Sequence, residues 1–259
     1  MKAVWAGVAL AALVAVAPAG SQTSTPTSYL PRTQLPNSLT LLPPPPAKGS
    51  GAEKRDKEAA AAAVKLHGGP RWDLATEDAN LAFPRAAGTY SCALGVPVTE
   101  ADTPTLYRLL RRSYADLGPA PYPTKNKYMR PRPFTVNKKP LCTPEIEAAL
   151  RKDGSYPSGH ATIGWGWALI LAEAAPDRAD AVLARGRAYT ESRRICNVHW
   201  LSDVEEGRTM ASAVVAKLHD SADFRADVAT AKAEIAAARA KGLAPSRDCD
   251  LEASRLAVQ

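Results

Sequence analysis

The chain has 259 residues, enough to bury a substantial core in one large domain or two small ones. It is rich in alanine, and its 46% hydrophobic and 6% aromatic residues favour helix. The formal net charge of +7 is compatible with nucleic acid, an anionic surface or a small anionic substrate. So few aromatic residues argue against a nucleic-acid or polyanion binder, which would interleave them with basic clusters along a groove.

The N-terminus has the pattern of a secretory signal. Lys2 gives it a positive charge, the apolar stretch "AVWAGVALAALVAVA" follows, and small residues precede Gly20. We expect residues 1–19 to be a signal peptide, cut after Ala19, and the mature protein to be periplasmic or secreted. An uncleaved anchor is the alternative, but the run is shorter than the roughly 20 residues that a span needs. The later apolar run meets Glu173, so we expect no membrane span in the mature protein.

A proline-rich arm is predicted for residues 20–50. It contains "QLPNSLTLLPPPPAKGSG", in which Pro43 to Pro46 favour polyproline geometry. We expect an extended arm or linker, whose "LTLL" stretch can dock on the body.

Helical patterns dominate residues 51–249, and residues 250–259 are predicted to form a C-terminal tail. The first helix, at residues 52–67, combines strong helix formers with a charged face and ends at a glycine pair. Further helices are predicted at residues 104–116, 144–152, 160–173, 177–192, 203–219 and 222–241. Because no alternating strand pattern stands out, we predict an all-α fold, a single-domain helical bundle without internal repeats.

The four cysteines are spaced widely and irregularly, without a C-x-x-C pair, which argues against a zinc site. An even number in an exported protein suggests two disulfides, but four cysteines allow three pairings. Small buried thiols are the alternative. The candidates are Cys92, Cys142, Cys196 and Cys249.

Basic residues concentrate in "KNKYMRPRPF", which begins with Lys125 and includes Arg132. Pro131 and Pro133 prevent a regular helix, so we expect the cations on a stiff, extended segment. Taken alone, the stretch could also be a solvated basic loop.

The stretch "PSGH" opens a long apolar helix. Ser158 is a natural N-cap, Gly159 lets the backbone approach a ligand closely, and free N–H groups at a helix start can bind an anion. His160 is then expected at that site as a proton donor. The alternative is a plain helix cap beside a surface histidine.

A third cluster lies in "ESRRICNVHWLSDVEEGR". Arg193 closes one helix, His199 falls in the break, and Asp203 starts the next helix, for which Ser202 and Glu205 suggest a capping box. The Asp203 carboxylate can accept one imidazole N–H and leave the other nitrogen with a free lone pair. The alternative is an ordinary helix junction with an ion pair.

Together the three clusters offer what phosphoryl transfer needs. Cations and a helix start can hold the oxygens of a phosphate, one histidine can attack, and the other can protonate the leaving oxygen.

The order of these residues resembles the signature of the type 2 phosphatidic acid phosphatase superfamily, Lys-x6-Arg-Pro, then Pro-Ser-Gly-His, then Ser-Arg-x5-His-x3-Asp. The three parts begin at Lys125, Pro157 and Ser192, and no signature position departs from the pattern. Within the superfamily the chain is similar to the bacterial class A non-specific acid phosphatases over most of its mature length. The similarity is weakest at residues 49–85 and after residue 241.

The resemblance implies an all-α catalytic domain that needs no metal or other cofactor and forms a phosphohistidine. It makes His199 the nucleophile, Asp203 its orienting partner, and His160 the acid and then the base. It places five residues around the phosphate: Lys125, Arg132, Ser158, Gly159 and Arg193. The implied partners are small phosphomonoester substrates, with phosphate or vanadate as inhibitors and no nucleic acid, and the oligomeric state is left open.

Three alternatives are weighed against this hypothesis. A vanadium-dependent haloperoxidase shares the site, because vanadate mimics the phosphoryl transition state, but such enzymes are usually much longer. A membrane lipid phosphatase needs several spanning helices, for which the sequence has no candidates. A basic polyanion-binding protein would account for the charge but not for the ordered motifs.

Overall fold

The computed structural model describes Met1 and residues 27–258, so the predicted cleavage site and nearly all of the signal peptide lie outside the described residues. The described part of the chain consists of helices, 3-10 turns and loops without a strand, which confirms the all-α prediction. Within the same residues, none of the helices is both long enough and apolar enough to cross a bilayer.

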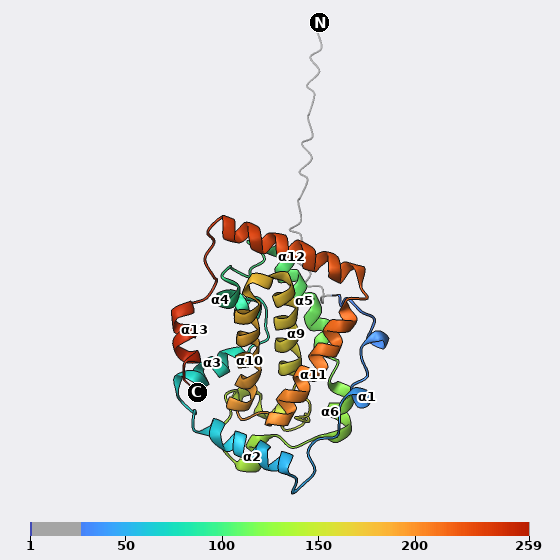
Figure 1. The fold of residues 1–259 in the computed structure, drawn as a ribbon, viewed down its shortest axis with the longest axis vertical. Helices are drawn as coiled ribbons and strands as arrows, with labels where there is room; N and C mark the ends of the chain where they lie inside the picture. The colour runs from blue at the N-terminus through green and yellow to red at the C-terminus, as the bar shows by residue number, and fades with distance from the viewer. Residues whose placement is uncertain (2–26, 259) are drawn as a thin grey trace.

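Three helices form the centre of the molecule: α9 (Gly159–Ala174), α10 (Ala179–Ile195) and α11 (Leu201–Leu218). They stand side by side in Figure 1, and α9 packs against both of the others. Most positions around α9 are buried, including Trp167, as is typical of a helix that is hydrophobic all round. This central helix carries the "PSGH" stretch at its start.

Several further helices surround these three central helices. α12 (Ala222–Ala240) crosses one end and packs on α5 (Pro104–Leu117), while α2 (Gly51–Val64) covers the other end (Figure 1). α3 (Pro70–Asp78) packs against both α10 and α13 (Cys249–Leu256). The two ends of the bundle are therefore closed by α12 and α2, both of which correspond to helices predicted from the sequence.

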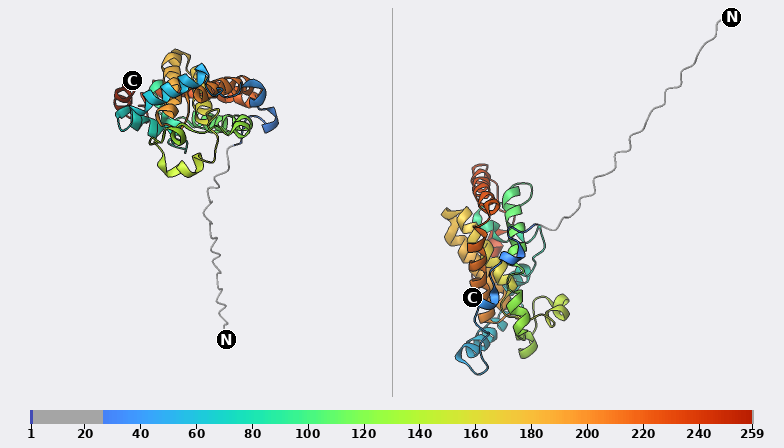
Figure 2. Two further views of the ribbon diagram at one scale, coloured as in Figure 1. Left: turned by 90° about the horizontal axis from the view of Figure 1, so that it is seen from below. Right: turned by 90° about the vertical axis from the view of Figure 1, so that its right-hand side faces the viewer.

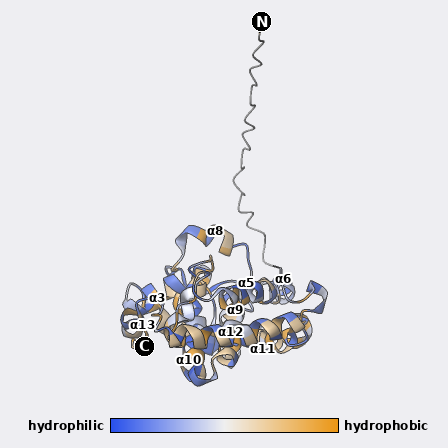
Figure 3. Ribbon diagram, turned by 90° about the horizontal axis from the view of Figure 1, so that it is seen from above, coloured by the Kyte–Doolittle hydropathy of each residue, from blue (hydrophilic) through white to orange (hydrophobic). Residues whose placement is uncertain are grey.

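The remaining helical segments are short. They are α1 (Ser38–Leu41), α4 (Ser91–Leu94), α6 (Tyr122–Tyr128), α7 (Pro133–Asn137), α8 (Glu147–Leu150) and the 3-10 turns Arg32–Gln34, Ala87–Tyr90, Pro144–Ile146 and Pro176–Arg178. The segment around α8 projects from the body, as Figures 2 and 3 show.

The described part of the proline-rich arm is docked on the body. The Asp116 carboxylate accepts the backbone N–H groups of Tyr29 and Leu30 at 2.9 and 3.0 Å. Further along, the Tyr156 hydroxyl donates to the carbonyl of Pro43 at 2.7 Å. Leu42, the last residue of "LTLL", is buried. The arm is thus held at two points and belongs to the folded body.

The basic stretch differs from the prediction. Lys125 lies in helix α6, which ends where Met129 adopts a left-handed φ of 41°. Only residues 129–132 lie outside a helix, and α7 starts at Pro133, where a proline fits the first helical position. The prolines therefore prevent a helix only in the few residues next to them, and Lys125 lies in a regular helix.

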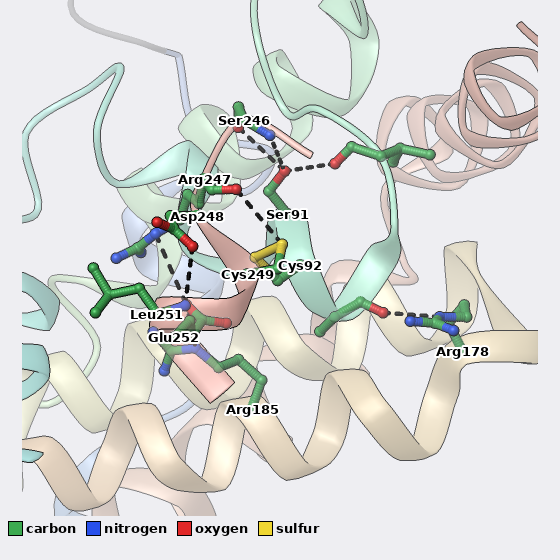
Figure 4. The surroundings of a disulfide bond; sticks show 12 residues. Ser91, Cys92, Arg178, Arg185, Ser246, Arg247, Asp248, Cys249, Leu251 and Glu252 are labelled. Atoms are coloured by element: carbon green, nitrogen blue, oxygen red, sulfur yellow. Dashed lines mark hydrogen bonds and ion pairs between the residues drawn. A yellow bond between two sulfur atoms is a disulfide. The ribbon is translucent and has the colours of Figure 1, made fainter. Parts of the chain in front are cut away.

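The C-terminal segment also differs from the predicted tail. α13 begins at Cys249, which forms a disulfide with Cys92 of α4 (Figure 4). Glu252 in this helix is buried, and its carboxylate lies 3.3 Å from Nε of Arg185 on α10. A covalent bond and a buried ion pair hold the segment on the body, and neither depends on a local sequence pattern.

The second disulfide joins Cys142 to Cys196, and no free cysteine remains in the described chain, which contains all four. The prediction of two disulfides is confirmed, and one of the three pairings is selected. Cys196 comes directly after α10, and Asn197 makes the turn with a left-handed φ of 60°. This disulfide therefore anchors the loop that leads to His199.

Candidate active site

The three sequence clusters meet at one cavity of about 640 Å³. Its lining includes Lys125, Arg132, Asp153, Gly159, His160, Arg193 and His199. Two predicted site residues, Ser158 and Asp203, lie behind this lining and are fully buried. The fold therefore brings together side chains from α6, from the N-terminus of α9, from the end of α10 and from the loop that follows it.

His199 lies in the break between α10 and α11. Nη1 of Arg132 lies 3.1 Å from its Nε2, and its Nδ1 lies 3.4 Å from Oδ2 of Asp203. A guanidinium can only donate, so Nε2 accepts with its lone pair and the ring proton is on Nδ1, facing the carboxylate. This is the tautomer that a nucleophilic imidazole needs.

Burial and the surrounding cations favour the neutral form of His199. Burial lowers the pKa of His199 well below its ordinary value of 6.5, and the charges of Arg132, Lys125 and Arg193 lower it further. Burial and the cations thus both favour the neutral imidazole, which is the form that can act as a nucleophile.

Asp203 caps α11 with its own side chain. Its Oδ2 accepts the backbone N–H of Trp200 at 2.8 Å, so that Trp200 is the N-cap and the helix starts at Leu201. The predicted capping box of Ser202 and Glu205 is therefore wrong. Ser202 instead donates its backbone N–H and its hydroxyl to the carboxylate of Asp56 at 2.8 and 2.7 Å.

The other oxygen of Asp203 is held by Arg130. This residue was not among the predicted site residues. Its Nη1 donates to Asp203 Oδ1 at 2.6 Å, and its Nη2 donates to Oδ2 of Asp56 on α2 at 2.6 Å. Arg132 lines the cavity, whereas Arg130 turns toward Asp56 and Asp203. These partners are distant along the chain, so no local sequence pattern could have identified Arg130.

Lys125 and Arg132 are buried and both contact Asp153. Nη2 of Arg132 donates to Asp153 Oδ2 at 2.8 Å, and Nζ of Lys125 lies 3.5 Å from the same oxygen. Lys125 also donates to the carbonyl of Gly154 at 2.6 Å. Burial, together with the charge of Arg132, lowers the pKa of Lys125 to about 8. The lysine therefore remains a cation throughout the acid range.

Arg193 is fully buried at the end of α10. Its Nε and Nη1 have no hydrogen-bond partner in the described part of the chain. Burial lowers its pKa to about 10, so the guanidinium stays charged at neutral pH. Buried donors without acceptors are unfavourable, and a phosphate oxygen would satisfy them with a charge-assisted bond.

The start of α9 is fastened to α11. Ser158 Oγ accepts the backbone N–H of Ala161 at 3.2 Å, so the predicted N-cap is present. The backbone N–H of Ser158 donates to the carbonyl of Asp203 at 2.9 Å. Gly159, the first residue of the helix, is the part of this cap that lines the cavity.

His160 is half-buried and directs one ring nitrogen away from the cations. Its Nε2 lies 3.0 Å from the carbonyl oxygen of Ala79 and must carry a proton there, because a carbonyl only accepts. Nδ1 is then the nitrogen left for proton transfer. Burial lowers the pKa of His160 well below 6.5, and the charge of Arg193 lowers it further.

The arrangement combines three buried cations, a backbone helix start and two histidines around one cavity. Such a site can bind a phosphate group, attack it, and exchange a proton with its ester oxygen. Within residues 27–258, no group of three or more His, Cys, Asp or Glu side chains is placed to hold a metal ion.

Comparison with known proteins assigns the family. The model of the PAP2 superfamily matches residues 117–224, a range that contains every signature position. The acid phosphatase of Zymomonas mobilis is 43% identical over 211 residues, which cover 80% of this chain and 78% of that protein. The chain belongs to the PAP2 superfamily.

Other PAP2 relatives are similar over most of their length. The non-specific acid phosphatase of Providencia stuartii is 40% identical over 231 residues, 88% of this chain and 93% of that protein. The non-specific acid phosphatase of Salmonella typhimurium is 38% identical over 200 residues, 77% and 80% of the two chains. The resemblance to bacterial acid phosphatases inferred from the motifs is confirmed, and with it the assignment as an enzyme of that kind.

Proposed function

We propose that this PAP2 protein is an exported, non-specific acid phosphatase that hydrolyses phosphomonoesters through a phosphohistidine intermediate. The observation that carries the proposal is the setting of His199, whose Nε2 lies 3.1 Å from Arg132 and whose Nδ1 lies 3.4 Å from Asp203. A lone pair in a cationic cavity, backed by a carboxylate, is what attack on a phosphate requires. The acid phosphatase names of three relatives support this substrate class.

In the first step, Nε2 of His199 attacks the phosphorus of the bound ester. A P–N bond forms while the P–O bond to the leaving group breaks, and His160 gives a proton to the leaving oxygen. Lys125, Arg132 and Arg193 stabilise the negative charge on the equatorial oxygens. These cations supply the charge that a metal ion supplies in other phosphatases, so we propose that the reaction is metal-independent.

In the second step, water attacks the phosphorus of the intermediate. His160, now neutral, takes a proton from this water as the new P–O bond forms. The P–N bond breaks, its electron pair returns to Nε2 of His199, and inorganic phosphate leaves. His160 is then protonated again, as it was at the start, and can give this proton to the next leaving group.

The pKa shifts favour activity at acid pH. Because the pKa of His160 is lowered, its ring is largely neutral at neutral pH and cannot protonate a leaving oxygen. Lowering the pH raises the protonated fraction, and the negative charge of a bound phosphate raises the pKa of His160 within the complex. We therefore expect kcat/KM to fall as the pH rises from acid to neutral.

Trapping by rapid acid quench tests the roles of the two histidines. His199→Ala is expected to abolish turnover and phosphohistidine labelling together. His160→Ala is expected to retain labelling from an aryl phosphate with a low-pKa phenol, while alkyl esters lose a further ~10²–10⁴-fold, the usual range of general-acid catalysis.

His219→Ala serves as the control, because His219 is only partly buried at the end of α11, pairs with Glu173 and does not line the cavity. Labelling in His199→Ala together with none in His160→Ala would show that the roles are reversed. No label in the wild-type enzyme would overturn the covalent mechanism.

Export is supported by two independent features. Residues 1–19 have the sequence pattern of a signal peptide, and the two disulfides suit an oxidising compartment such as the periplasm.

A further inference from the structure

The carboxylate of Asp153 lies among the cations that are proposed to hold the phosphate. Its Oδ2 accepts a hydrogen bond from Nη2 of Arg132 at 2.8 Å and lies 3.5 Å from Nζ of Lys125. The two cations are 3% exposed, whereas the Asp153 side chain is 34% exposed and lines the same cavity as the two histidines. An anionic group of the protein thus lies where an anionic substrate has to bind.

Apart from the Asp153 carboxylate, the groups that accept hydrogen bonds from Arg132 are neutral. Nε donates to the carbonyls of Leu150 and Asp153, and Nη1 faces the carbonyl of Val198 and the imidazole of His199. Nη2 is shared between the Asp153 carboxylate and the carbonyl of Gly154. The carboxylate is therefore the charged acceptor on this guanidinium, and a phosphate must compete with it.

The side chain of Asp153 has no contact that would fix it for another purpose. Within residues 27–258, its hydrogen-bond and ion-pair partners are Arg132 and Lys125. Asp153 follows α8 in a loop next to Gly154, and its partial exposure leaves room for the carboxylate to turn toward solvent.

We propose that Asp153 is a built-in competitor of the phosphate group and so sets the anion affinity of the site. The carboxylate pairs with Arg132 and Lys125 in the empty enzyme, turns away when a phosphomonoester binds, and returns as inorganic phosphate leaves. Competition of this kind raises the apparent Kd by the inverse of the fraction of sites that the competitor leaves free. It also limits product inhibition. The inference rests on the proposed function, because it takes these cations as the phosphate site.

The test compares the wild-type enzyme with Asp153→Asn at one pH and ionic strength. The Kd of inorganic phosphate is measured by titration calorimetry, which does not require turnover, and the Ki of phosphate and vanadate is measured with an aryl ester. Both constants are expected to be about tenfold lower in Asp153→Asn, the change for a competitor that occupies about 90% of the empty sites.

Two further variants control for charge. Asp153→Glu keeps the carboxylate and is expected to bind phosphate more weakly than Asp153→Asn. Glu147→Gln removes a partly exposed carboxylate of the nearby α8, which pairs with Arg151 just after that helix. The Kd of this variant is expected to stay within about twofold of wild type, as for a pair open to solvent.

An unchanged Kd in Asp153→Asn overturns the competitor role, and a higher Kd overturns it in favour of a role in aligning Arg132. In either case phosphate still binds, so the proposed function stands. If neither protein binds phosphate or vanadate, the proposed site itself is wrong and the role of Asp153 falls with it.

Discussion

Arg130 lies behind the signature residues and contacts the carboxylate that faces His199. Burial raises the pKa of Asp203, and the charge of Arg130 is the largest influence that lowers it. Without a cation beside it, a fully buried carboxylate tends to take up a proton, and a protonated Asp203 would stabilise the imidazolium poorly. Asp56 fixes Arg130 from the opposite side, 2.6 Å from its Nη2. We infer that Arg130 is a positioning residue that keeps Asp203 ionised and oriented.

We predict that Arg130→Gln impairs catalysis. Removing one partner of a buried pair is strongly unfavourable, and we expect kcat/KM to fall by about 10²-fold, with part of the loss due to protonation of Asp203. Because Asp203 then needs a higher pH to ionise, the acid limb of the kcat/KM profile should move to higher pH. Arg130→Lys, which keeps the charge, should restore part of the activity. A pH profile measured for each variant checks this.

Arg239→Gln is the matched control, since Arg239 makes an exposed pair with Asp177 at 2.5 Å, away from the cavity lining. It should leave the profile unchanged. A profile of Arg130→Gln that keeps the wild-type shape would show that Arg130 acts only on stability.

Helices α11 and α9 are in close contact where they carry the site. A Cβ on Gly207 of α11 would lie 2.7 Å from the carbonyl oxygen of Ser158 and 2.8 Å from Cβ of Ala161. Glycine at this position lets the helix that bears Asp203 touch the N-terminus of the helix that bears His160. The hydrogen bond from the Ser158 N–H to the Asp203 carbonyl depends on the same approach.

We predict that Gly207→Ala separates these helix segments. Alanine adds up to about 1 kcal/mol of helix propensity, but a backbone oxygen at 2.7 Å cannot rotate away, and overpacking destabilises by about 1–3 kcal/mol. The midpoint of thermal unfolding should fall by a few degrees, at roughly 2–4 °C per kcal/mol for a chain of this size. The value of kcat should fall with it. Thermal unfolding and steady-state kinetics measure the two effects.

Gly51→Ala in α2 is the comparison, because a Cβ there meets no atom within 4 Å. It should be neutral or slightly stabilising, with unchanged kcat. If Gly207→Ala leaves the unfolding midpoint and kcat as little changed as Gly51→Ala does, then close contact between α11 and α9 does not determine the relative positions of the two histidines.

For the whole molecule, the segments at both ends of the described chain are fastened to the helical body. The arm is bound through Asp116 and Tyr156, and α13 is bound through the disulfide between Cys92 and Cys249. The second disulfide anchors the loop before His199. Closing long loops restricts the unfolded chain, so these bonds are expected to contribute to stability.

We expect the protein recovered from the periplasm to begin at Gly20 and to show no free thiol when denatured without reductant. The reason is that a signal peptide would be cut after Ala19 and both disulfides would form in an oxidising compartment. Intact-mass measurement and thiol titration check the two expectations separately. A retained N-terminus would argue against cleavage, and four titratable thiols would argue against the disulfides without affecting the proposed chemistry.

The sequence alone was sufficient to predict contacts between site residues that lie close together along the chain. His199 and Asp203 lie four positions apart at the start of α11, and Ser158 to His160 form the start of α9, so spacing and capping preference already relate them. The long helices are predictable for the same reason, since hydrophobic period and helix breakers act locally.

Only the tertiary structure decided the contacts between distant residues. Arg130 and Asp56 are separated by 74 positions, His160 and Ala79 by 81, and the cysteines of the first disulfide by 157. The position of Asp153 against Arg132 depends in the same way on how the loop after α8 folds back on the cavity. Such contacts arise from the packing of whole helices, which buries a residue beside partners that its own stretch of sequence does not specify.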